Sequence, residues 1–124
     1  MKIGKFKNIF HNINGEAYAL DAHTILIKGF TYDGEGPDAF FLAGTSGKPS
    51  RKDGDVVLPY PYEGKRFSYT DRNIPLLLRP FTREEVVLTV PPPYTVDSLK
   101  WISVWCRDYQ VDFGHLIMPQ NFKL

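Results

Sequence analysis

Glycine and proline interrupt this sequence so often that no long helix fits between them. The chain has 124 residues, of which 10 are Gly and 10 are Pro. The runs between them are short and rich in β-branched and aromatic residues, and no dozen residues show a clean helical period. This pattern predicts one all-β domain over residues 1–124, a β-sandwich or partly open barrel of mostly antiparallel strands.

The β-prone runs predict at least six strands in two packed sheets and no α-helix longer than about three turns. Asn14-Gly15 is a turn signal, and Asp21-Ala22-His23 predicts the short connection of a hairpin. The predicted strands cover residues 3–11, 16–20, 24–30, 39–43, 56–58, 74–78, 85–90 and 99–106. The predicted core positions include Phe40, Leu42, Leu88, Ile102 and Val104.

Residues 99–115 hold both tryptophans and the single cysteine. On a strand, alternation places both tryptophans on one face and Ile102, Val104 and Cys106 on the other. Cys106 then shares its face with aliphatic side chains, as an inert core thiol would. Arg107 marks the end of the strand, where a thiol can lie near water and a guanidinium favours its thiolate. The residues leave both interpretations open, a structural thiol or a redox-active one.

Charge and hydropathy exclude several classes of partner. The formal net charge is +1, with 15 basic and 14 acidic residues and no basic cluster, so we expect no nucleic-acid partner. No apolar run reaches the roughly 18 residues of a membrane span, so we expect no insertion into a membrane. A single cysteine excludes an intrachain disulfide and leaves the redox compartment undecided.

Isolated histidines do not predict a metal centre. His11, His23 and His115 together with Cys106 could supply four ligands for zinc, but none of them falls at the spacing of a ligand pair. No Ser-His-Asp order and no pair of carboxylates identifies a catalytic site. We therefore expect a protein without enzymatic activity of its own.

A glycine-rich loop carries three carboxylates. These could bind calcium, but their order does not match the helix–loop–helix pattern, and Asp side chains in turns commonly accept backbone hydrogen bonds. We expect an ordered loop without a metal, with Gly34 or Gly36 at positive φ and the Asp carboxylates bonded to backbone N–H groups. The loop consists of Tyr32, Asp33, Gly34, Glu35, Gly36, Pro37 and Asp38.

Aromatic residues are frequent enough to form either a binding surface or a core. Tyr60, Tyr62, Phe67 and Tyr69 alternate with other residue types, a spacing that can present rings to a sugar or a peptide. Core packing explains the same spacing equally well. The residues considered for an aromatic surface are Trp101, Trp105, Tyr60 and Tyr62.

Several runs together resemble a known family. The first is Phe30-Thr31-Tyr32-Asp33-Gly34-Glu35-Gly36-Pro37-Asp38-Ala39-Phe40-Phe41 with Gly44-Thr45-Ser46-Gly47, and the second is Leu88-Thr89-Val90-Pro91. The others are Lys100-Trp101-Ile102-Ser103-Val104-Trp105-Cys106 and Asp112-Phe113-Gly114-His115. Over about residues 13–119 the chain resembles the DM-thirteen domain, an extracellular module of Skeletor- and Knickkopf-type proteins that often lies beside haem-binding DOMON domains.

The resemblance implies an extracellular β-domain whose single cysteine, here Cys106, takes part in redox chemistry or electron transfer. The cysteine would act as a free thiol or through a prosthetic group, with Arg107 and His115 as candidates for tuning or for shared ligation. We expect a free thiol and no cofactor in the isolated domain, and a haem or metal bound through Cys106 is the open alternative.

The resemblance also implies a second interpretation. In members like Knickkopf the domain helps to organise a chitin-containing extracellular matrix, and Cys106 would then be structural. The implied partners are other extracellular domains such as DOMON, or a matrix polysaccharide or protein.

Overall fold

The computed structural model describes residues 1–71 and 77–124. Its strands are β1 (Lys2–Lys5), β2 (Lys7–Asn8), β3 (Asn14–Asp21), β4 (Thr24–Tyr32), β5 (Ala39–Gly44), β6 (Val56–Leu58), β7 (Phe81–Thr89), β8 (Trp101–Cys106) and β9 (Val111–Ile117). One short 3-10 helix, η1 (Val96–Ser98), precedes β8. No helix in the described ranges is long and apolar enough to cross a membrane.

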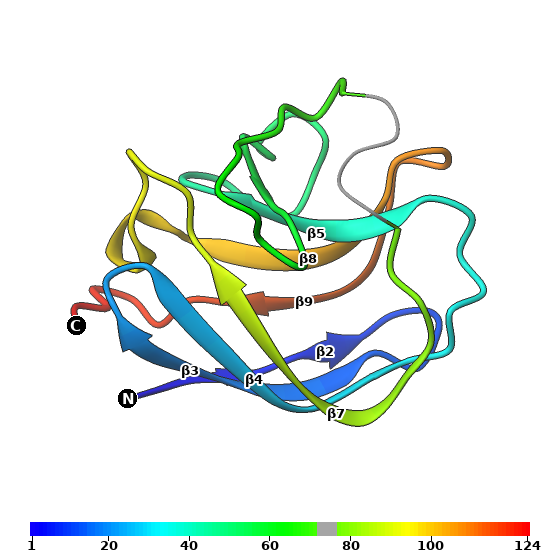
Figure 1. Ribbon diagram of the computed structural model, residues 1–124, viewed down its shortest axis with the longest axis horizontal. Helices are drawn as coiled ribbons and strands as arrows, with labels where there is room; N and C mark the ends of the chain where they lie inside the picture. The colour runs from blue at the N-terminus through cyan, green and yellow to red at the C-terminus, as the bar shows by residue number, and fades with distance from the viewer. Residues whose placement is uncertain (72–76) are drawn as a thin grey trace.

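The strands form two antiparallel sheets that pack face to face, which confirms the predicted β-sandwich (Figure 1). One sheet has the order β1-β3-β4-β7 and the other has the order β2-β9-β8-β5-β6. β3 and β4 form the predicted hairpin, in which Ala17 pairs with Ile27. β8 lies in the middle of the second sheet between β9 and β5, so its side chains meet neighbours on both faces.

The described residues form two separate apolar clusters. The main core fills the space between the sheets and includes Leu88, Ile102, Val104 and Cys106. A smaller cluster lies on the outer face of the second sheet, and it consists of Phe40, Leu42, Val57, Trp101 and Trp105 with Phe67 and Tyr69 packed against it. All five predicted core positions are buried, and the predicted division of β8 into a tryptophan face and a cysteine face is confirmed.

The two tryptophans, which were candidates for an aromatic surface, are core residues instead. Trp101 is 0% exposed and Trp105 is 3% exposed. The Trp101 indole donates to the Ser46 carbonyl at 3.0 Å, and the Trp105 indole donates to the Tyr69 hydroxyl at 2.9 Å. The long connections on either side of β6 therefore cover this face of the sheet. Rings enclosed in this way cannot present themselves to a sugar or a peptide.

The predicted strand over residues 3–11 is wrong as a single element. β1 belongs to one sheet and β2 to the other, and buried Phe6 lies where the chain passes between them. The chain then reverses at His11 and Asn12, which both have positive φ. The turn predicted at Asn14-Gly15 is instead the beginning of β3, at an irregularity in its pairing with β4. Residues that cross between sheets keep a strand-like composition, so the sequence pattern does not show the break.

Other boundaries also differ from the prediction. β7 begins at Phe81, four residues before the predicted strand at 85–90. The strand predicted at 74–78 falls mostly outside the described residues, and Leu77 and Leu78 are not in a strand. β9 has no predicted counterpart with stated bounds.

We expect truncation of a tryptophan in the outer cluster to destabilise the fold strongly. Trp101→Ala should lower the free energy of unfolding by about 3–5 kcal/mol, because it removes a fully buried ring and leaves a cavity. Urea denaturation measures the change. Tyr109→Ala, at a side chain that is 68% exposed, should change it by no more than about 0.5 kcal/mol. If both substitutions lowered the free energy of unfolding by the same small amount, the outer cluster would not be a packed core.

Candidate functional site

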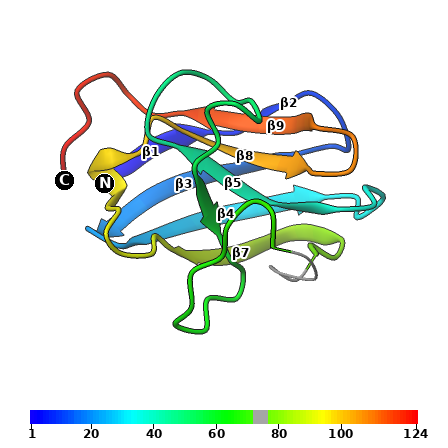
Figure 2. The same cartoon turned by 90° about the horizontal axis from the view of Figure 1, so that it is seen from above.

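Three turns meet at one end of the sandwich, which we call the loop end: residues 9–13, 33–38 and 107–110. The N- and C-termini lie at the opposite end (Figures 1 and 2). Cys106 is the last residue of β8 at the loop end, and it faces the main core. The thiol is free and its residue is 0% exposed. Of the two settings that the sequence left open for Cys106, the structure shows the core setting and not a thiol near water.

Tyr32, Gly36 and Phe113 close the loop end in direct contact with one another. The rings of Tyr32 and Phe113 stack with centroids 6.3 Å apart. A Cβ atom on Gly36 would lie 2.4 Å from the Phe113 ring and 2.7 Å from the Tyr32 hydroxyl, so only glycine fits there. The Gly36 N–H donates to that hydroxyl at 2.9 Å.

Tyr32 is buried and lies near Cys106. Burial raises the pKa of the Tyr32 hydroxyl, the hydrogen bond from the Gly36 N–H opposes this, and the nearby negative charge of Asp33 adds to the rise. Tyr32 therefore stays protonated at neutral pH, and its hydroxyl accepts the Gly36 N–H in the closed loop end.

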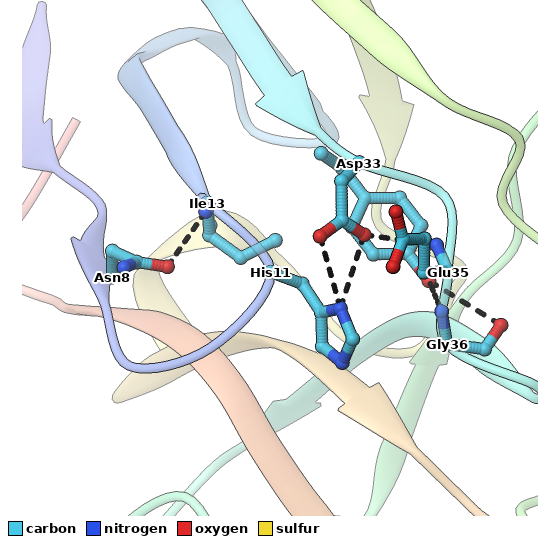
Figure 3. A network of polar contacts seen from close by, with 7 residues as sticks. Asn8, His11, Ile13, Asp33, Glu35 and Gly36 are labelled. Atoms are coloured by element: carbon cyan, nitrogen blue, oxygen red, sulfur yellow. Dashed lines mark hydrogen bonds and ion pairs between the residues drawn. The ribbon is translucent and has the colours of Figure 1, made fainter.

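The loop after Tyr32 has the geometry predicted from its glycines. Gly34 has a φ of 77°, and the Asp33 carboxylate accepts the Glu35 N–H at 2.8 Å. The same carboxylate contacts His11 Nδ1 at 3.0 Å, which joins this loop to the turn after β2 (Figure 3). His11 also packs on Phe113, with ring centroids 4.2 Å apart. The contacts of His11 with Asp33 and Phe113 were not predicted, because in the sequence His11 stands out only as an isolated zinc ligand.

Asp38 and Arg107 form a two-point ion pair beside Cys106. Arg107 Nε and Nη2 donate to the Asp38 carboxylate at 2.9 and 3.1 Å. Arg107 Nη1 donates to the carbonyls of Tyr69 and Asp71. The hydrogen bonds to Asp38 raise the pKa of Arg107 above its ordinary value. The prediction that the Asp38 carboxylate bonds to backbone N–H groups is therefore wrong, and Arg107 is engaged away from the thiol.

His115 lies on the other face of the sheet from Cys106. It pairs with Ser103 in the β8–β9 ladder, whereas Cys106 pairs with Val111. Asp112 accepts hydrogen bonds from Ser103 Oγ at 2.7 Å and from His115 Nδ1 at 2.5 Å. His115 and Cys106 therefore cannot share a ligand. Because the carboxylate lies between the hydroxyl and the imidazole, this trio also lacks the order of a nucleophilic triad.

The residues around Cys106 do not fit a haem. The thiol is packed between sheets, its backbone neighbours across the ladder are Ala39 and Val111, and the imidazole of His115 lies on the opposite face. A haem needs an open cavity beside its axial ligand, whereas the Cys106 side chain is fully buried among the side chains of the main core.

The candidate aromatic residues do not form one surface, and the histidines considered as zinc ligands do not form one site. Tyr60 packs on Phe81 at a centroid distance of 6.0 Å and lines a pocket of about 220 Å³, and Tyr62 is only partly exposed. His23 Nδ1 contacts the Val90 carbonyl at 3.0 Å, far along the chain from the partners of His11. Within residues 1–71 and 77–124 no three metal-binding side chains form a group.

Comparisons with known proteins match nearly the whole chain. The family model described as "Electron transfer DM13" matches residues 5–118. Protein Skeletor of Drosophila melanogaster, in isoforms B/C and in isoforms D/E, is 36% identical over 121 residues, which is 97% of this chain. The match spans only 14% and 7% of the lengths of these relatives. No solved structure matches the chain.

We expect the Asp38–Arg107 pair to contribute substantially to stability. Asp38→Asn should lower the free energy of unfolding by about 2–4 kcal/mol, because it leaves a largely buried guanidinium without its counterion. The matched control is Glu84→Gln, which breaks the exposed two-point pair with Arg79 and should lower the free energy of unfolding much less than Asp38→Asn does. Equal losses in urea denaturation would show that Asp38 is no more important than a surface carboxylate.

Tyr32 should titrate above the ordinary range of tyrosine. Its pKa in the folded protein is raised, so its contribution to stability is complete below about pH 10 and is lost as the pH rises through the folded value. Ultraviolet absorbance should therefore show a late phenolate component that Tyr32→Phe abolishes. Tyr109→Phe should retain it, and loss of the component in that control instead would refute the assignment.

Proposed function

This chain belongs to the DM13 family of electron-transfer domains, and we propose that the thiol of Cys106 is the group through which it exchanges electrons. Because the chain spans a small part of its relatives, the proposal concerns this domain only. We further infer an extracellular location and neighbours such as DOMON domains from the resemblance of the motif runs.

The observation that carries the proposal is the convergence of distant motif residues around the single cysteine. Tyr32 and Gly36 come from one run, Phe113 comes from another, and all three pack together at the loop end. The Asp38–Arg107 pair lies at the residue that follows Cys106. The motif that identifies the family thus builds the enclosure of this thiol.

Burial restricts the chemistry that the thiol can perform. A peroxide or a second thiol must touch the sulfur, and the closed loop end prevents that contact. Electron loss needs no such contact. In this step the Cys106 thiol gives one electron to a one-electron acceptor, such as an oxidised haem in a partner domain, and its proton passes to water when the loop end briefly opens. The cysteine becomes a thiyl radical and the acceptor is reduced by one electron.

Two oxidants of different mechanism test the proposal. Hexachloroiridate(IV) removes one electron without bonding to sulfur, whereas hydrogen peroxide must transfer an oxygen atom to it. We expect hexachloroiridate(IV) to abolish the free thiol that Ellman's reagent detects after unfolding, while hydrogen peroxide reacts far more slowly than it does with the unfolded chain. If the thiol survives both oxidants in the folded protein, Cys106 is structural and the proposal is wrong.

Loosening the loop at residues 33–38 should change the reaction of Cys106 with hydrogen peroxide and not its reaction with hexachloroiridate(IV). Asp33→Ala removes the contact with His11 and the hydrogen bond from the Glu35 N–H, so the closed state should open more often. The rate of thiol loss to peroxide should rise several-fold, and the rate with hexachloroiridate(IV) should change little. Asp55→Ala, which removes a carboxylate bonded to Thr45 in a different loop, is the matched control and should leave both rates unchanged.

A further inference from the structure

We propose that the loop end is the docking surface for a redox partner whose own contact surface carries both apolar and basic side chains. This inference rests on the proposed function of Cys106, because it names the kind of protein that would accept the electron. It concerns exposed residues that the enclosure of the thiol does not use.

Three large apolar side chains are exposed at the loop end. Ile9 is 41% exposed, Phe10 is 54% exposed and Tyr109 is 68% exposed. The N–H groups of Ile9 and Phe10 both donate to the Phe113 carbonyl, at 2.9 and 2.8 Å, so this turn is fixed beside β9. Tyr109 belongs to the neighbouring turn between β8 and β9. Exposed aromatic and aliphatic side chains gathered on ordered turns are typical of a protein contact surface.

Among the described residues of the loop end, the charged side chains without an ion-pair partner are negative. Asp33 pairs with His11 and Asp38 pairs with Arg107, so neither carboxylate is free. Glu35 and Asp108 are exposed, and the described part of the chain offers them no ion pair. A partner with basic side chains would complement these two carboxylates. Such pairs chiefly accelerate association and orient the complex, as a transient electron-transfer contact requires.

The position of the surface also fits a partner that receives an electron from Cys106. Cys106 ends β8 directly before the turn at residues 107–110, and it belongs to the same buried cluster as Tyr32 and Phe113. The two termini lie at the far end (Figure 1), so the flanking segments of the longer relatives would join the domain away from this surface. A partner docked at the loop end would thus lie beside the end of the strand that carries the thiol.

Cytochrome c, a small basic haem protein, is a suitable probe. In ¹⁵N-edited NMR spectra at low salt we expect it to shift the amide signals of residues 9–12, 34–36 and 107–110, and added salt should weaken the effect. Glu35→Lys combined with Asp108→Lys should weaken binding about tenfold or more. Glu85→Lys, an exposed position in the middle of β7, is the matched control and should leave binding unchanged. Phe10→Ser with Tyr109→Ser should weaken binding at every salt concentration.

The outcomes separate this inference from the proposed function. Cys106→Ser should bind cytochrome c as the wild type does, because the thiol is not part of the contact surface. Binding at the loop end together with a thiol that resists one-electron oxidation would therefore refute the redox role and leave the docking surface standing. Absence of any shift at low salt, shifts centred elsewhere, or equal weakening by Glu85→Lys would each overturn the docking surface.

Discussion

The loop end depends on the ion pair between Asp38 and Arg107, because this pair holds the adjoining ends of β5 and β8 together. Asp38 immediately precedes β5, and Arg107 immediately follows β8, so the pair closes the ladder in which Ala39 faces Cys106. The remaining N–H groups of the guanidinium reach two carbonyls of the connection after β6. A charge this enclosed is tolerated only when its hydrogen bonds are satisfied. The pair therefore holds two strands and a loop in one arrangement around the cysteine.

The enclosure makes access, rather than local electrostatics, the main control on the thiol. A guanidinium beside a cysteine usually favours its thiolate, but here Arg107 is occupied by Asp38 and by backbone carbonyls. Close packing of Gly36 against Phe113 leaves no room for a reagent to enter without movement of the loop. The reactivity of Cys106 toward reagents that must touch it then follows the free energy of opening the loop end.

Local patterns in the sequence were sufficient for the fold class, the family, the β3–β4 hairpin and the two faces of β8. The fold class, the hairpin and the two faces of β8 follow from alternation and turn chemistry within a few residues, and the family follows from the resemblance of the motif runs. The burial of Trp101 and Trp105 was not predictable in this way, because it depends on connections tens of residues away that fold over the sheet. The same holds for the partner of Arg107, which lies 69 residues away in sequence. Contacts between residues far apart in the sequence decide which candidate site residues meet and which lie on opposite faces of the sheet.

A buried thiol and an electron-transfer role are compatible if the partner binds the closed form. Any protein that contacts the turns at residues 33–38 and 107–110 in their closed arrangement lowers the population of the open form, in proportion to its preference for the closed one. Reagents that need contact with sulfur are then excluded more strongly, while an electron still passes without contact. Docking and protection of Cys106 would therefore reinforce each other. A thiol exposed at the surface would lose this selectivity, because every oxidant in solution would reach it as easily as the partner.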